Sequence, residues 1–173
     1  MTRFGSTFLG LCLACCLIMP AKAHQESTAY LDVALSGEGV TARLELSLDD
    51  LDYALGLDAN ADRELDWSEV DNAAPRIQKY VEAGLSLSSS KGDCRIAQGK
   101  FAVEDRAHGG PYLVIPLEVA CVNALPNRLT YELLFEHDRR HRVKTTVAAG
   151  DKTMTEVLTS RRRVLSLPNN ATH

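Results

Sequence analysis

The chain has 173 residues, of which 19 are Lys or Arg and 23 are Asp or Glu, so its net charge at pH 7 is −4. This length is sufficient for one domain with its own core, and the acidic balance argues against nucleic acid as a partner. Beyond residue 23, no stretch approaches the roughly 18 consecutive apolar residues of a membrane-spanning helix. We therefore predict one domain over residues 24–166, followed by a flexible polar tail at 167–173.

The first 23 residues have the pattern of a secretory signal peptide. Arg3 supplies a positive charge, residues 4–20 form an apolar stretch, and Ala21-Lys22-Ala23 is a small-x-small cleavage site. A membrane anchor is the competing interpretation, but the apolar run is short and is interrupted by glycine, serine and threonine. We expect cleavage before His24 and a periplasmic or secreted mature protein.

The first elements after the leader are two strands and a short helix. Residues 28–35 and 40–47 alternate apolar with polar side chains around Gly37-Glu38-Gly39, which predicts a β-hairpin. The apolar period then becomes helical, and Ser47 followed by Asp50 resembles a capping box. A helix is therefore expected directly after the hairpin.

The segment from Asp58 to Glu69 carries oxygen-bearing side chains at loop positions 1, 3, 5, 9 and 12. In an EF-hand these positions bind calcium, because alternate residues of the tight loop point inward and a bidentate carboxylate closes the shell. The predicted ligands are Asp58, Asn60, Asp62, the backbone carbonyl of Glu64, Asp66 and Glu69. The alternative is an acidic linker that never binds metal, since Asp and Asn also favour turns and caps.

The sixth loop position departs from the EF-hand pattern. It holds Arg63, whereas an EF-hand has glycine there for the sharp bend. A non-glycine residue with positive φ costs about 1 kcal/mol, and the guanidinium adds a positive charge near the ion. We therefore expect a weak calcium site with a structural role, of the kind that extracellular modules use at dissociation constants of about 0.1 to 1 mM.

A second helix follows the loop. Its apolar residues recur at the spacing of a helix packed on a core, at Trp67, Val70, Ala74, Ile77 and Val81. Pro75 predicts a kink or a restart, because an interior proline removes a backbone hydrogen bond. The two helices and the loop form a predicted helix-loop-helix insertion at about residues 48–83.

From Leu85 onward the alternating pattern of strands returns. The predicted strands are residues 85–88, 94–104, 112–121, 129–135, 143–148 and 154–158, with turn residues between them. Several short strands with regular turns are typical of antiparallel sheets. The predicted fold is mainly β, an antiparallel β-sandwich with an EF-hand-like helix-loop-helix insertion after the first hairpin.

The five cysteines divide into two groups. Cys12, Cys15 and Cys16 would leave with the signal peptide, whereas Cys94 and Cys121 would remain. An oxidising compartment favours a disulfide between these two. The alternative, a pair of thiolate metal ligands, has no second cysteine near either residue in the sequence. We predict the Cys94–Cys121 disulfide.

The histidines support a rival hypothesis of metal handling. His24 would become the mature N-terminus, where the α-amine and the imidazole together can chelate copper or nickel. His108, His137 and His141 are further candidate ligands, although no spacing rule joins them. We interpret His137 and His141 as solvent-facing turn residues at a strand end. Binding of copper or nickel by His24 and other histidines is thus the alternative function.

No phosphate loop, catalytic dyad or cofactor fingerprint is recognisable, so we predict no enzymatic activity. The turn at His108-Gly109-Gly110 is similar to an oxyanion-hole turn, but no nucleophile elbow accompanies it. The basic run Arg161-Arg162-Arg163 could meet anionic headgroups, and we interpret it as a solvated face. The predicted function is an exported calcium-binding domain that acts as a binding or accessory module in the cell envelope, with an envelope or membrane protein as its partner.

Four segments resemble one known family. They are Ser27-Thr-Ala-Tyr30-Leu31, the run DDLDYALGLD from Asp49 to Asp58, Trp67-Ser68-Glu69, and FEHDRRHR from Phe135 to Arg142. Together they resemble the exported N-terminal region of the HupE/UreJ-like membrane proteins, named after hydrogenase and urease accessory factors. The resemblance covers most of residues 23–166 and implies a soluble β-rich head. The membrane helices with proposed nickel or cobalt permease activity have no counterpart in this sequence, so transport is not implied.

Overall fold

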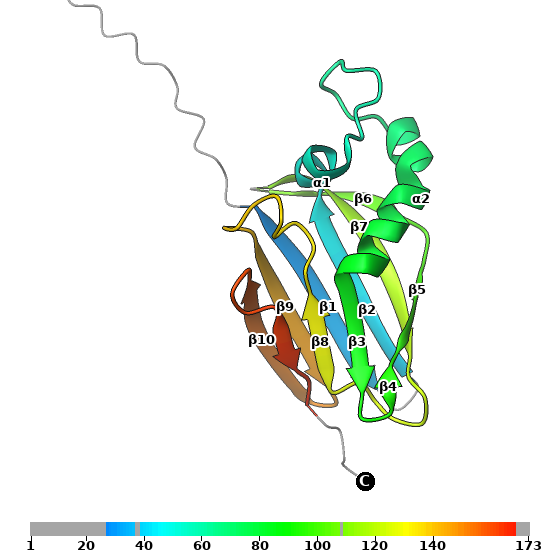
Figure 1. Cartoon of the computed structure of the whole chain (residues 1–173), viewed down its shortest axis with the longest axis vertical. Coiled ribbons are helices and arrows are strands. Elements are labelled where there is room, and N and C mark those ends of the chain that lie inside the picture. Colours follow the sequence, from blue (N-terminus) through cyan, green and yellow to red (C-terminus); the bar gives the residue numbers. More distant parts are fainter. Residues whose placement is uncertain (1–26, 37–38, 108, 169–173) are drawn as a thin grey trace, which may run out of the picture.

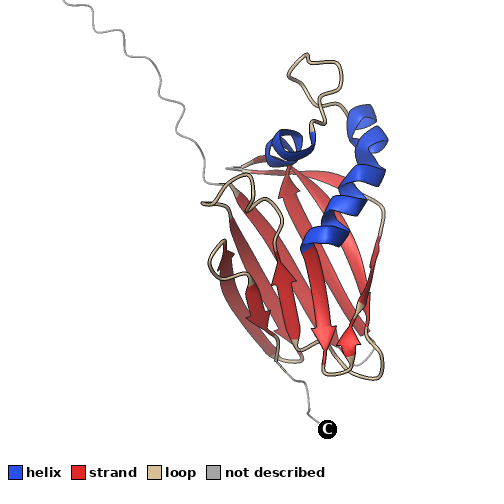
Figure 2. Cartoon of the chain, viewed as in Figure 1, coloured by secondary structure: helices blue, strands red, loops and turns tan. Residues whose placement is uncertain are grey.

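The computed structural model describes residues 27–36, 39–107 and 109–168. The predicted signal peptide, His24, His108, the Gly37-Glu38 part of the hairpin turn and the end of the tail lie outside these residues. Within them, two sheets and two helices contribute to one hydrophobic core (Figure 1, Figure 2). The fold is mainly β, as predicted.

The larger sheet has seven strands in the order β10, β9, β1, β2, β7 and β5, with β6 also paired to β7. Its members are β1 (Thr28–Ser36), β2 (Gly39–Ser47), β5 (Arg95–Gln98), β6 (Ala102–Arg106), β7 (Gly110–Ala120), β9 (Arg142–Ala149) and β10 (Lys152–Thr159). The antiparallel pair β1 and β2 confirms the predicted hairpin. However, β1 and β9 are parallel, a pairing that local alternation of side chains does not predict.

The smaller sheet has four antiparallel strands in the order β11, β8, β3 and β4. They are β3 (Leu85–Ser89), β4 (Gly92–Asp93), β8 (Arg128–Tyr131) and β11 (Val164–Ser166). Leu87 and Leu129 of this sheet and Leu31 and Leu44 of the larger sheet are fully buried and belong to the same core cluster. The two sheets therefore share one core.

The strand predicted at residues 94–104 is divided into β5 and β6. Between them, the Gly99 N–H donates to the Pro116 carbonyl at 2.8 Å, and a Cβ at position 99 would lie 3.3 Å from the Pro116 Cβ. The backbones approach closely there, so the two strands pair with different parts of β7. The strand predicted at 129–135 is also shorter, since β8 ends at Tyr131 and turns follow it.

The helices are α1 (Leu48–Leu55) and α2 (Trp67–Gly84), which bury Leu51, Ile77 and Val81 among other residues. The predicted restart at Pro75 is wrong, because α2 is continuous through it. Pro75 is exposed, so water can satisfy the carbonyl that its missing N–H leaves free. Neither of these two described helices has the length and apolar character needed to cross a bilayer.

The predicted capping box at Ser47 is wrong. Ser47 occupies the N-cap position of α1, but its side chain makes no capping hydrogen bond. Asp50 instead accepts a hydrogen bond from the Ser27 hydroxyl at 2.8 Å. A contact with a distant part of the chain has therefore replaced the local cap.

Cys94 and Cys121 form the predicted disulfide. In the register of β5 and β7, Arg95 faces Ala120, so the two cysteines are the next pair along the two strands. Their Cα atoms are 4.2 Å apart. The bond thus fastens the short edge strand β5 to the longer strand β7.

Candidate metal centre

The loop between α1 and α2 is organised by side-chain oxygens that accept hydrogen bonds from its own backbone. Asp58 Oδ2 accepts from the Arg63 N–H at 2.9 Å, Asn60 Oδ1 from Asp62 at 2.8 Å, and Asp62 Oδ1 from Glu64 at 2.8 Å. Three of the predicted ligands therefore fold toward the loop backbone.

The C-terminal part of the loop forms a capping box on α2. Asp66 Oδ1 accepts from the Glu69 N–H at 2.9 Å, and Glu69 Oε2 accepts from the Asp66 N–H at 3.2 Å. Hydrogen bonds from the Ser68 hydroxyl and the Glu69 N–H hold the pKa of Asp66 below its usual value. The predicted second helix thus begins at Trp67, and its capping box at Asp66 and Glu69 is a feature that we did not recognise from the sequence.

Glu69 joins the two ends of the loop. Its carboxylate is buried, and Oε1 accepts from the N–H groups of Ala59 at 3.0 Å and Asn60 at 3.3 Å. The predicted closing ligand therefore reaches across the loop, as the EF-hand hypothesis requires. In this arrangement it holds backbone amides, so an ion would compete with these hydrogen bonds.

Asp58 has one oxygen that accepts from Arg63 and one that is buried without a partner. Among the described residues, Asp58 Oδ1 is one of three buried side-chain polar atoms with no hydrogen bond. Burying a carboxylate oxygen without a partner is costly, and a cation at that oxygen would remove the cost. This orphaned oxygen at loop position 1 fits the predicted calcium site.

The other predicted ligands do not form a ready cluster. Among the described residues, no three His, Cys, Asp or Glu side chains lie close enough together to hold an ion. Asn60, Asp62 and Asp66 are exposed. Calcium binding through the predicted set would therefore require these side chains to rearrange around Asp58.

Arg63 adopts the left-handed conformation that the EF-hand pattern assigns to glycine. Its φ is 70°, and Ala61 is also left-handed with φ of 61°. The positive φ at the sixth loop position agrees with the sequence prediction, whereas Ala61 was not expected. Both residues carry a Cβ in a region that favours glycine, so both positions are strained.

Arg63→Gly is expected to raise the free energy of unfolding by about 0.5 to 1 kcal/mol without calcium, because the strain at φ 70° disappears. It should also strengthen calcium binding, since a cation leaves the loop. Urea unfolding and calcium titration would measure the two effects. Ala61→Gly is the matched control, because it relieves strain and leaves the charge unchanged; a destabilised Arg63→Gly variant would contradict this account of the bend.

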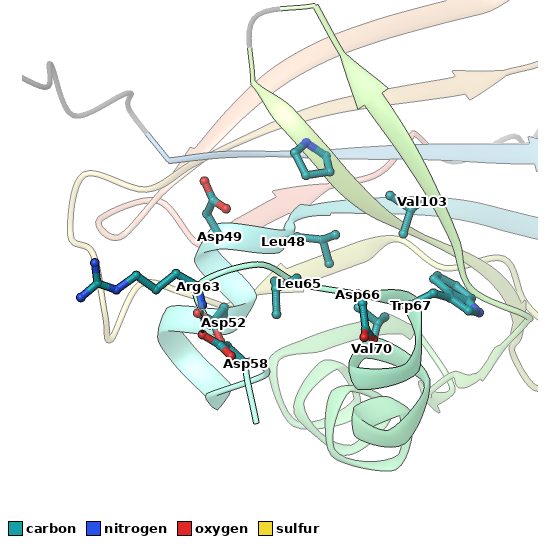
Figure 3. A pocket seen from close by; sticks show the side chains of 11 residues that line it. Leu48, Asp49, Asp52, Asp58, Arg63, Leu65, Asp66, Trp67, Val70 and Val103 are labelled. Carbon is teal, nitrogen blue, oxygen red and sulfur yellow. Dashed lines mark hydrogen bonds between the residues drawn. The ribbon is translucent and has the colours of Figure 1, made fainter. Parts of the chain in front are cut away.

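A cleft of about 430 Å³ lies beside the loop (Figure 3). In Figure 3, Asp52 and Asp58 lie at one end of this cleft, and the half-exposed Trp67 lies at the other. Asp52 Oδ1 accepts from the N–H groups of Leu57 at 2.6 Å and Asp58 at 2.9 Å. Asp52 therefore positions Asp58, a role that we did not predict. Trp67 was predicted to face the core, and it faces the cleft instead.

The prediction that His141 faces solvent is wrong. Its ring is buried, with Nδ1 2.5 Å from the Ser27 hydroxyl and Nε2 3.2 Å from the Tyr131 hydroxyl. Burial lowers the pKa of His141 to about 4. Both ring nitrogens are engaged, so His141 is not available as the metal ligand that the rival hypothesis needs. His137 lies at the surface, with its ring against Tyr53.

Comparison with protein-family models gave no match to this chain, and comparison with curated proteins gave none either. The resemblance to the HupE/UreJ-like proteins therefore stays a prediction from sequence. Within the residues that the structure describes, the chain is a mainly β domain with a disulfide and an acidic loop between two helices.

Proposed function

We propose that this chain is an exported, non-enzymatic domain that binds calcium at the Asp58–Glu69 loop for a structural purpose. In this proposal the two sheets form a β-sandwich, and the helix-loop-helix between β2 and β3 is EF-hand-like. The observation that carries it is the buried, unpartnered Oδ1 of Asp58. The left-handed φ of Arg63 at the sixth loop position is a second support.

The residues that would hold calcium are the predicted set of Asp58, Asn60, Asp62, the Glu64 carbonyl, Asp66 and Glu69. Bound calcium would supply a hard positive charge that neutralises the orphaned oxygen and closes the loop. Each of Asp58, Asn60 and Asp62 already has a hydrogen bond that turns it toward the loop backbone. Calcium binding would also cost the hydrogen bonds that Glu69 accepts from the N–H groups of Ala59 and Asn60, because the carboxylate would have to release them.

The wider role that we propose is a binding or accessory module in the periplasm or cell envelope, with an envelope or membrane protein as partner. A disulfide in the domain is typical of an oxidising compartment, which supports export. The resemblance to the exported region of HupE/UreJ-like proteins supports the envelope role. The engaged ring nitrogens of His141 favour calcium over the copper or nickel alternative.

Calcium at ten times its dissociation constant is expected to stabilise the exported domain by about 1.4 kcal/mol. For a chain of this size, that corresponds to a rise in melting temperature of about 3 to 5 °C. Asp58→Asn should abolish the rise, because the amide oxygen can still accept from Arg63 while the NH₂ group takes the place of Oδ1. The measurement is thermal unfolding with and without millimolar calcium.

The matched control is Asp71→Asn, which removes the same charge from the exposed face of α2 near the loop. This variant should retain the calcium-dependent rise. The proposal fails if the unaltered domain ignores millimolar calcium, or if Asp58→Asn and Asp71→Asn weaken the response equally.

A further inference from the structure

A second cleft lies where arginines from the turn before β9 meet arginines from the turn after β10. It has a volume of about 860 Å³, and it is lined by Arg139 and Arg140 of the turn before β9, Arg142 of β9, and Arg161 and Arg163 of the turn after β10. No carboxylate is among the described residues that line it. In a chain whose net charge is −4, this is a local concentration of positive charge.

Part of this charge is not balanced by neighbouring acids. Arg140 Nε lies 3.5 Å from Asp138, and the Arg163 guanidinium lies 3.4 Å from Glu132. Among the described residues, the Arg139 and Arg161 guanidinium groups form no ion pair. Two exposed guanidinium groups on facing turns are thus left to attract an anion.

The walls of the cleft are held in place by one hydrogen bond between the two turns and by a second within the turn after β10. The Ser160 hydroxyl donates to the Arg139 carbonyl at 2.9 Å, and Arg163 Nε donates to the Ser160 carbonyl at 3.0 Å. The Arg163 guanidinium also lies 5.6 Å from the centre of the Phe135 ring. These contacts fix the distance between the turns and reduce the conformational entropy that ligand binding would cost.

We propose that this cleft binds a phosphate group, carried either by a soluble molecule or by an anionic lipid headgroup. The planar guanidinium presents paired N–H donors that match the oxygens of a phosphate, and several arginines converge on the same space. From the sequence we interpreted the run 161–163 as a solvated basic surface. Such a surface would not be concave, and it would not include arginines from the turn before β9.

The test is binding at about 150 mM salt, where interactions between separate exposed charges are screened beyond a Debye length of about 8 Å. One arm titrates the protein with inorganic pyrophosphate by calorimetry. The other arm measures sedimentation with phosphatidylcholine vesicles, with and without phosphatidylglycerol. If pyrophosphate binds, a phosphate on a soluble molecule is a sufficient ligand. If only the vesicles that contain phosphatidylglycerol bind, the ligand is a lipid headgroup.

Arg139→Gln combined with Arg161→Gln should weaken binding by about tenfold or more, since charge-assisted hydrogen bonds are lost. The matched control is Arg95→Gln combined with Arg128→Gln, which removes the same charge from exposed arginines that do not line the cleft. This control should bind as the unaltered protein does. The proposal is overturned if neither pyrophosphate nor the anionic vesicles bind, or if both double variants lose binding equally.

The substituted side chains are exposed, so the variants should fold as the unaltered protein does. Their melting temperatures would check this. Should the first double variant be unstable, Arg140→Gln combined with Arg161→Gln removes two charges from the same cleft and leaves Arg139 in place, with the same expected loss.

Discussion

Removal of the Cys94–Cys121 disulfide is expected to lower the free energy of unfolding by about 3 to 4 kcal/mol. The bond closes a loop with a sequence separation of 27 residues, and its loss restores conformational freedom to the unfolded chain. In the folded chain it also fastens β5, a strand of four residues that lies at the edge of the larger sheet. Urea unfolding of the Cys94→Ser/Cys121→Ser variant would measure the loss.

The matched control for this variant is the unaltered protein after reduction, because it lacks the bond and keeps both sulfur atoms. Reduced protein and variant should lose similar stability, and exchange of the β5 backbone amides should accelerate in both. A loss below about 1 kcal/mol would contradict the entropic argument. Pairing with β7 would then be sufficient to hold β5.

Sequence patterns predicted best those features that depend on local periodicity or on the chemistry of one residue type. The alternation in residues 28–35 and 40–47 predicted the β1–β2 hairpin, and the oxidising compartment inferred from the leader predicted the disulfide. The position of Arg63 in the loop pattern predicted its left-handed backbone. Each of these depends on local periodicity or on a chemical preference of one residue type.

Features that depend on distant contacts were missed. The predicted cap at Ser47 failed because Asp50 bonds to Ser27, 23 residues earlier in the chain. The parallel pairing of β1 with β9 has no local signal, since an intervening chain of several elements separates the two strands. Long-range contacts of this kind select among conformations that local patterns leave equally acceptable.

The candidate site shows the same division. The acidic pattern identified the residues of the loop, but Glu69 was interpreted only as an ion ligand, and its bonds to Ala59 and Asn60 were not expected. Asp52 lies outside the pattern, although it positions Asp58. The sequence signal for Asp52 would have been a carboxylate near the C-terminus of the first helix, where it can accept the free N–H groups of the following loop.

The error at His141 has a similar origin. The surrounding residues Asp138, Arg139, Arg140 and Arg142 are charged, which is typical of an exposed turn. The ring nevertheless stacks near Tyr131, with centroids 6.0 Å apart, and packs edge-on against Phe135. Its backbone stays in the turn while its side chain fills a space in the core. Local composition describes the neighbours of His141 and does not report the direction of its side chain.

Acid is expected to destabilise the domain through His141. Burial lowers the pKa of this residue in the folded protein to about 4, below the ordinary value of 6.5 that applies to the unfolded chain. Between these two pH values the unfolded chain binds a proton that the folded protein does not bind, so stability is lost as pH falls from 6.5 to 4. At pH 5 the loss relative to pH 7.5 is about 2 kcal/mol.

His141→Gln should remove most of this pH dependence, because glutamine stays neutral over the whole range. Asp50 acts in the opposite direction. Burial raises its pKa, so at low pH Asp50 binds a proton more readily in the folded protein than in the unfolded chain, which stabilises the folded protein as the pH falls. Urea unfolding at pH 7.5 and pH 5 measures the difference for each variant. His137→Gln, which changes the surface histidine of the same turn, is the matched control and should keep the acid sensitivity of the unaltered domain. If His141→Gln loses as much stability between these pH values as the unaltered domain does, then another group carries the acid response, and the buried ring is not its source.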